Sequence, residues 1–125
     1  MRLALTLAAV ATATSLASAA VAHPKLVASN PTAGATVARP ARVQLRFDEK
    51  LVSRFSRADI VMTAMPGMTD HPPMKVAGTA TVAPDGRTLV VTPAKPLAAG
   101  SYRVDWRVVA ADTHPVTGKL AFSVR

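Results

Sequence analysis

Hydrophobic and polar residues alternate one by one in three segments of this chain. Val43–Phe47 reads apolar, polar, apolar, polar, apolar, and residues 102–108 keep the same alternation over seven positions. Leu120, Phe122 and Val124 repeat it near the C-terminus. A period of two is typical of a β-strand with one face in the core, so these segments are predicted to be strands.

Weaker signals of the same kind fill the chain between these segments. We expect further strands at residues 25–29, 59–63, 75–82 and 88–92. Turn-forming residues separate the predicted strands, at Asn30-Pro31 with Gly34, Pro84-Asp85-Gly86, Pro93 to Pro96 and Ala99-Gly100. No segment keeps a 3.6-residue period, and proline recurs too often for long helices. About seven short strands in roughly 100 residues predict an all-β fold, an antiparallel two-sheet sandwich or Greek-key barrel, with Tyr102 and Trp106 in its core.

The first 22 residues have the order of a secretory signal peptide. Arg2 precedes an apolar, alanine-rich stretch at residues 3–13, and small residues then lead to Ala20-Val21-Ala22. The apolar stretch is too short to remain in a bilayer, although an uncleaved anchor is the alternative. We therefore predict that residues 1–22 are a cleaved signal peptide and that residues 23–125 are one mature domain, exported to the periplasm.

The charge of the chain is strongly positive, with 15 Lys and Arg residues against 7 Asp and Glu and a formal net charge of +8. The basic residues are spread singly, unlike those of a nucleic-acid-binding arm, so we expect no nucleic-acid partner. Cysteine is absent from the sequence, which excludes a disulfide scaffold, a thiolate metal site and a cysteine nucleophile. Because half of the residues are hydrophobic, the chain is not a disordered basic tail.

Cleavage after Ala22 would give His23 a chemical role that it lacks in the full chain. A free amine and the Nδ1 atom of the same histidine can close a six-membered chelate ring on a metal ion. Pro24 follows and has no amide N–H, so the chelate cannot extend along the backbone. His23 is therefore a candidate metal ligand; the alternative is that it is merely the residue at which the peptidase cuts.

Methionine is concentrated in one short segment of the mature chain. Every methionine except Met1 lies between positions 62 and 74, at a spacing of three residues in which a histidine fills the missing step: Met62, Met65, Met68, His71 and Met74. Prolines and a glycine within the segment exclude a helix there. The segment must therefore bend to bring these side chains together, and Pro66-Gly67 and Thr69-Asp70 are the expected bends.

Thioether sulfur is a soft and uncharged donor, which suits Cu(I) and is poor for Mg²⁺, Ca²⁺ or Zn²⁺. The alternative is a flexible methionine loop that fills gaps over the core or forms an apolar surface to which a partner protein binds. For Met62 a core position is a fair competitor, because it continues the alternation of Ile60. For the whole loop we favour Cu(I) binding, since gap filling does not call for regular spacing or for a histidine in register.

A second candidate metal site lies near the C-terminus. Asp112-Thr113-His114 places a carboxylate and an imidazole two residues apart, and in an extended backbone these side chains project to the same side. Oxygen and imidazole donors suit Cu(II) or Zn²⁺. Alone, such a pair is more often a surface acid beside a turn histidine. Together with His23 it predicts a nitrogen and oxygen site for oxidised copper, separate from the sulfur site for the reduced ion.

Four signatures occur in order along the mature chain: HPKL at residues 23–26, VMTAMPGMTDHPPM at 61–74, YRVDW at 102–106 and DTHPVTG at 112–118. In these signatures the chain resembles the CopC family of periplasmic copper-resistance proteins, over essentially the whole mature domain. The resemblance implies a small immunoglobulin-like β-barrel that carries copper and catalyses no reaction. It also implies transfer of copper to other resistance proteins, such as an inner-membrane CopD-like transporter, and we expect a mostly monomeric protein.

The resemblance further implies two copper sites. Family members hold Cu(II) through the N-terminal histidine and the D-x-H residues, which here are His23, Asp112 and His114. They hold Cu(I) through the methionines and histidine of the loop, and the matching positions here are Met62, Met65, Met68, His71 and Met74. The gap between the third methionine and the histidine is one residue longer in this chain than is usual, within Thr69-Asp70. Glu49 lies in the family's acidic turn and is expected to be a surface charge; the alternative is that it approaches the Cu(II) site.

Two other functions fit part of the sequence. Lytic polysaccharide monooxygenases also bind copper through an N-terminal histidine, the histidine brace, so a copper monooxygenase-like enzyme is the alternative. Such an enzyme needs a flat face with exposed aromatic side chains, and most of the five aromatic residues of this chain alternate into predicted strands. A basic β-sandwich module that binds anionic partners fits the charge but leaves both candidate metal sites unexplained.

Overall fold

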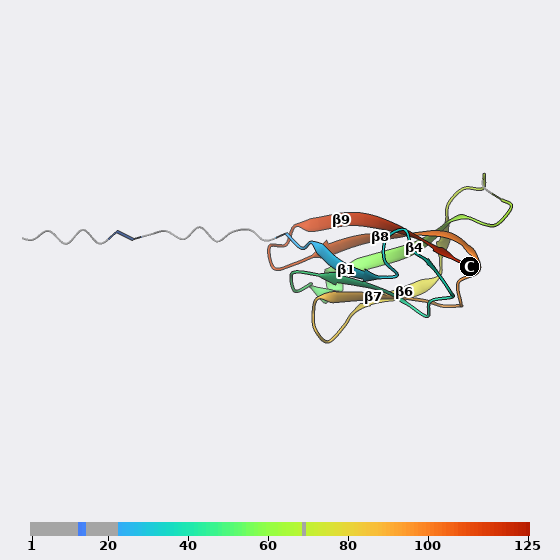
Figure 1. Cartoon of the computed structure of the whole chain (residues 1–125). Coiled ribbons are helices and arrows are strands. Elements are labelled where there is room, and N and C mark those ends of the chain that lie inside the picture. The colour runs from blue at the N-terminus through green and yellow to red at the C-terminus, as the bar shows by residue number, and fades with distance from the viewer. Residues whose placement is uncertain (1–12, 15–22, 69) are drawn as a thin grey trace, which may run out of the picture.

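The computed structural model describes residues 13–14, 23–68 and 70–125 (Figure 1). The predicted signal peptide, residues 1–22, falls almost wholly outside these ranges. Within them, no helix is long and apolar enough to cross a membrane.

Two β-sheets pack face to face (Figure 1). The strands are β1 (Leu26–Asn30), β2 (Thr36–Val37), β3 (Val43–Phe47), β4 (Arg57–Ala64), β5 (Met74–Val76), β6 (Gly78–Val82), β7 (Thr88–Pro93), β8 (Gly100–Val109) and β9 (Pro115–Val124). One sheet has the order β1-β3-β7-β6 and the other β2-β9-β8-β4-β5. A single 3₁₀ turn, η1 (Ser53–Phe55), precedes β4. The predicted all-β sandwich is therefore confirmed.

The described part of the chain has nine strands where about seven were expected. The predicted strand at residues 75–82 is wrong as a single element, because it divides at Ala77 into β5 of one sheet and β6 of the other. Strand β2 was not predicted; its two residues are too few to display a period, and they pair with β9 in the parallel sense. In both places the strand pairing depends on segments far away in the chain, and a local sequence pattern contains no information about them.

The core between the sheets is built from the alternating residues of the three strongest predicted strands. Val43, Leu45 and Phe47 of β3 are buried, as are the alternate residues 102, 104, 106 and 108 of β8. Leu120, Phe122 and Val124 of β9 complete the core from the other side of the hairpin. These strand predictions are confirmed, and burying one face of each stabilises the sandwich by removing apolar surface from water.

The Trp106 side chain leaves no room for a side chain on the residue opposite it in β9. Gly118 is its cross-strand partner, and a Cβ atom at Gly118 would lie 2.3 Å from the indole ring. The ring therefore occupies the place of the missing side chain, and its edge meets Phe47 at a centroid distance of 6.1 Å. Tyr102 stacks on Phe122 at 5.6 Å. Both large aromatic side chains of β8 belong to the core, as predicted.

The long β8–β9 hairpin separates two ends of the molecule. The turn between these strands, residues 110–114, lies beside the start of β1 (Figure 1). The β4–β5 hairpin, which carries the methionines, projects at the other end, near the C-terminus (Figure 1). Strand β8 has ten residues, so at about 3.3 Å per residue the two ends are roughly 30 Å apart.

Candidate metal centres

The N-terminal arm of the mature domain meets the β8–β9 turn. Nδ1 of His23 lies 2.9 Å from Oδ2 of Asp112, and Nδ1 of His114 lies 4.0 Å from the same oxygen. The two imidazole rings are 6.2 Å apart between centroids. The fold thus brings together the three residues that the sequence named as candidate Cu(II) ligands.

A tight turn, rather than an extended strand, brings Asp112 and His114 together. The N–H of Thr113 donates to the carbonyl of Ala110 at 3.0 Å, and Thr113 has a positive φ of 65°. The N–H of His114 donates to Oδ1 of Asp112 at 3.3 Å. The expectation that an extended backbone aligns these side chains is therefore wrong in its reason. A left-handed conformation is costly for a β-branched residue, so the surrounding hairpin must hold Thr113 in place.

The carboxylate of Asp112 is the most buried group of this cluster. Its side chain is 8% exposed, against 56% for His23 and 70% for His114. Oδ2 of Asp112 is buried and has no aligned hydrogen-bond donor in the described part of the chain. A buried carboxylate oxygen without a donor is costly unless a cation or donor reaches it.

The side chains of His23, Asp112 and His114 are not already arranged around one metal position. Within residues 13–14, 23–68 and 70–125, no group of three or more His, Cys, Asp or Glu side chains has the arrangement of a metal site. Two reasons are visible in the chain itself. Nδ1 of His23 contacts the carboxylate of Asp112. The backbone nitrogen of His23 is an amide nitrogen, not a free amine, as long as residue 22 precedes it.

At the other end, the methionine segment forms a hairpin with a tight turn at its tip. Met65 and Met68 exchange backbone hydrogen bonds, at 3.2 Å and 3.0 Å, across Pro66-Gly67. Gly67 has a φ of 76°, which is the conformation that a type II turn requires after proline. The predicted bend at Pro66-Gly67 and the predicted absence of a helix are confirmed. The second predicted bend, Thr69-Asp70, includes Thr69, which lies outside the described residues.

The hairpin register arranges the methionines as two cross-strand pairs. Met62 faces Met74 at the base, and Met65 faces Met68 at the tip. Met65, Met68 and Met74 are exposed, whereas Met62 is half-buried and packs against the core. The alternative position for Met62, as a continuation of the core face of β4, is therefore realised. The other three thioethers are exposed, and none of them is among the side chains that pack against the core.

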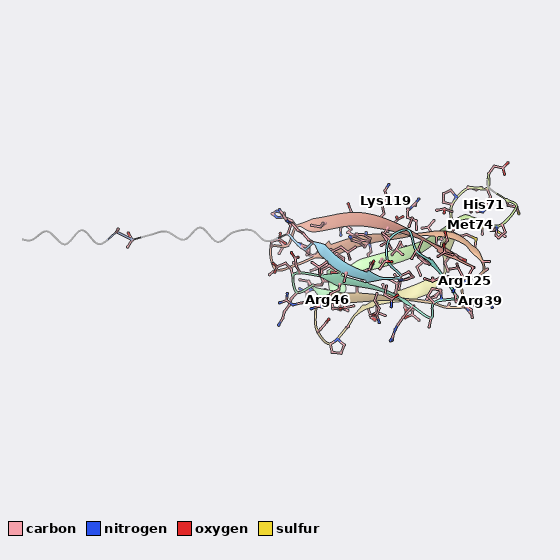
Figure 2. All side chains as sticks on the ribbon, in the orientation of Figure 1. Arg39, Arg46, His71, Met74, Lys119 and Arg125 are labelled. Atoms are coloured by element: carbon pink, nitrogen blue, oxygen red, sulfur yellow. The ribbon has the colours of Figure 1, made fainter. Side chains whose placement is uncertain are left out.

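His71 completes this group with an unused lone pair. Its Nδ1 lies 2.9 Å from the carbonyl oxygen of Pro72, which can only accept, so Nδ1 carries the proton of the neutral ring. Nε2 is then the unprotonated nitrogen, and it is buried without a partner among the described residues. Figure 2 shows His71 and Met74 on the same projecting hairpin. A soft metal ion could therefore take this nitrogen together with thioether sulfur.

The family model for the CopC domain matches residues 26–125. The chain belongs to the CopC family. It is 57% identical over 114 residues to "Copper resistance protein C" of Xanthomonas campestris pv. juglandis, covering 90% of this chain and 89% of that protein. It is 54% identical over 106 residues to the protein of that name in Pseudomonas syringae pv. tomato, covering 85% and 83%.

Two solved structures extend this result to three dimensions. Selenomethionine PcoC, a copper resistance protein from Escherichia coli, has a TM-score of 0.79 and 47% identity, and the match covers 82% of this chain and all of PcoC. CopC from Methylosinus trichosporium OB3b has a TM-score of 0.69 and 34% identity, covering 82% and 93%. The expected CopC resemblance and the expected fold are confirmed.

Sequence reasoning missed one residue of the CopC-family domain that touches the N-terminal arm. Oδ1 of Asp48 accepts a hydrogen bond from the backbone N–H of Lys25 at 2.7 Å. The only signal in the sequence is the acidic turn at residues 47–52, in which Asp48 and Glu49 are adjacent and carry the same charge. Glu49, the residue named from the sequence, makes no hydrogen bond or ion pair with any described residue.

Proposed function

We propose that this CopC-family chain is a periplasmic copper carrier of a copper-resistance system, with Cu(II) bound at the mature N-terminus and Cu(I) bound at the methionine hairpin. One observation carries the proposal. Among the described residues, two buried side-chain nitrogen or oxygen atoms lack an aligned hydrogen-bond partner: Oδ2 of Asp112, which has only the unaligned Nδ1 of His23 at 2.9 Å, and Nε2 of His71. Each belongs to one of the two candidate sites, and a bound metal ion would satisfy both.

For Cu(II), the proposed donors are nitrogen and oxygen atoms. The amine and Nδ1 of His23 would form a chelate after removal of residues 1–22, and Asp112 and His114 would close the site from the turn. The 2.9 Å contact between His23 and Asp112 means that the ion replaces a contact that already exists. Little rearrangement of the arm is then required, which favours binding.

For Cu(I), the proposed donors are the exposed thioethers Met65, Met68 and Met74 with Nε2 of His71. Met62 stands beside Met74 at the base of the hairpin and contributes least, because it also packs against the core. Neutral thioethers stabilise the monovalent ion without a charge that would attract harder cations. The two sites therefore discriminate between oxidation states by donor type.

The separation of the sites defines how the protein would work. Across roughly 30 Å no ion passes from one site to the other by ligand exchange within one molecule. Each end would load and unload against its own partner, among which an inner-membrane CopD-like transporter is the expected acceptor. We propose a carrier without catalysis, since cargo exchange needs only reversible ligation at two open ends.

The histidine-brace enzyme is the weaker alternative because the described part of this chain does not present the flat face of exposed aromatic side chains that such an enzyme needs. Tyr102, Trp106, Phe47 and Phe122 are buried in the core, and Phe55 alone is exposed among the aromatic residues. Among the basic residues labelled in Figure 2, Lys119, Arg46 and Arg39 lie at separate places on the sandwich. This distribution favours neither a polysaccharide surface nor a nucleic acid as partner.

The free amine of His23 provides the sharpest test. The mature chain beginning at His23 is compared with the same chain acetylated only at its N-terminal amine, using Cu(II) titration followed by electron paramagnetic resonance. We expect acetylation to weaken Cu(II) binding by about a hundredfold or more, since the amine can no longer close the six-membered chelate with Nδ1. Cu(I) binding should be the same in both chains. Equal Cu(II) affinity would refute the N-terminal site.

A further inference from the structure

The N-terminal arm is fastened to the sandwich two residues after His23. The backbone N–H of Lys25 donates to Oδ1 of Asp48 at 2.7 Å, and the N–H of Asp48 donates to the carbonyl of Lys25 at 3.0 Å. The carbonyl of Asp48 in turn accepts from a guanidinium N–H of Arg87 at 2.6 Å. Asp48 is thus joined to the arm on one side and to the start of β7 on the other.

This fastening lies beyond the end of the regular strand pairing. The β1–β3 register begins with Leu26 opposite Phe47 and is irregular between Leu26 and Ala28. The Asp48 side chain therefore supplies an acceptor just beyond the last ladder pair. Pro24 is buried but has no N–H of its own, so Lys25 is the first residue after His23 whose backbone can donate to the sandwich.

Chain ends fray unless something holds them, and His23 would be a chain end in the mature protein. Its contacts in the described residues are with Asp112 and His114, which are themselves proposed ligands. The apparent affinity of such a site is reduced by the fraction of time in which the arm is detached. A residue that keeps the arm attached without touching the ion would therefore strengthen Cu(II) binding.

We propose that Asp48 is a positioning residue for the Cu(II) site, which holds the arm so that the donors of His23 remain beside Asp112. This inference rests on the proposed function. Asp48 acts through the backbone of Lys25 and does not ligate copper. Its neighbour Glu49 has the same charge and lacks these hydrogen bonds, so it is the matched control for a negative charge near the site.

The test compares three variants of the mature chain: Asp48→Ala, Asp48→Asn and, as the matched control, Glu49→Ala. In the copper-free protein, hydrogen exchange of the Lys25 amide should be faster in Asp48→Ala by roughly tenfold, because a hydrogen bond to a charged group is lost. Cu(II) affinity should fall by a similar factor, with unchanged Cu(I) affinity. Asn retains a side-chain oxygen at the same reach, so Asp48→Asn should recover most of both quantities, and Glu49→Ala should alter neither.

The outcomes separate the two proposals. If the unaltered mature chain does not bind Cu(II) through His23, the proposed function fails, whatever the amide exchange shows. If it binds Cu(II) and Asp48→Ala matches it in exchange and affinity, the positioning role is overturned while the site stands. Loss of affinity in Asp48→Asn as large as in Asp48→Ala, or an equal loss in Glu49→Ala, would also overturn the role, because charge would then explain the effect. Denaturant unfolding of each variant checks that the sandwich is intact.

Discussion

The two ends of this CopC-family domain assemble their candidate donors in opposite ways. At the N-terminal end, His23 comes from the arm before β1, whereas Asp112 and His114 come from the β8–β9 turn. At the hairpin end, every donor lies between positions 62 and 74. One site is thus made by long-range tertiary structure and the other by a local hairpin, and damage to the fold should affect them unequally.

The ends also differ in their chemistry. The N-terminal donors are an amine, two imidazoles and a buried carboxylate, and protons compete with a metal ion for these donors. The hairpin donors are thioethers, which do not titrate, with one imidazole. The comparison therefore predicts different responses to donor removal, to acid and to disturbance of the core.

The largest effect is expected from removing the sulfur donors. Replacing Met65, Met68 and Met74 together with leucine keeps similar side-chain volume and should reduce Cu(I) affinity by at least about a hundredfold, because hydrocarbon offers no soft lone pair. Competition with a Cu(I) chelator measures the loss. Cu(II) affinity and the free energy of unfolding should be unchanged.

Met62 supplies the internal control for that experiment. Because its side chain packs against the core, Met62→Leu should weaken Cu(I) binding far less than the triple change. If the triple change leaves Cu(I) binding intact, or lowers Cu(II) binding equally, the division between the two ends is wrong.

Lowering the pH should reduce the Cu(II) and Cu(I) affinities unequally, and the difference between them should be smaller than after removal of the sulfur donors. Protons compete with the metal for amine and imidazole nitrogen, so lowering the pH from about 7.5 to about 6 should weaken Cu(II) binding by roughly a hundredfold. Cu(I) binding should weaken by roughly fivefold at most, since its donors include one imidazole and the thioethers bind no proton. Titrations of each ion across this range measure both slopes, and parallel slopes would contradict the donor assignment.

The smallest effect on binding is expected from the core. Gly118→Ala places a methyl group where the Trp106 ring lies, and overpacking of this kind should lower the free energy of unfolding by about 1–3 kcal/mol. Urea unfolding followed by Trp106 fluorescence measures it. Because Gly118 lies on the strand that begins just after His114, any loss of copper affinity should appear for Cu(II) and not for Cu(I).

A surface neighbour provides the control for the core change. Thr117 is exposed on the same strand, so Thr117→Ala should leave the unfolding free energy within about 0.5 kcal/mol. Equal destabilisation by both changes would mean that the close approach of the ring at Gly118 carries no special cost.

Local patterning was sufficient for the elements that pack one face into the core. Apolar and polar residues alternate in Val43–Phe47 and in residues 102–108 because each strand buries one face in the core. That alternation can be read from the sequence itself. The bend at Pro66-Gly67 was predictable for a similar reason, since proline fixes φ at the first central position of the turn and glycine tolerates the positive φ that the second requires. The donor types, too, are a property of the side chains and need no fold to be recognised.

The sequence by itself therefore determined an all-β chain with soft donors in one segment and nitrogen and oxygen donors in two others. The tertiary structure alone decided that residues 75–82 divide between two sheets, that Thr113 adopts a left-handed turn, and that Asp48 fastens the arm at Lys25. The division between sheets and the fastening of the arm depend on contacts between segments far apart in the chain, and the turn at Thr113 depends on the hairpin around it. Such contacts are fixed by how complete strands pair and pack, and no short pattern of residues encodes them.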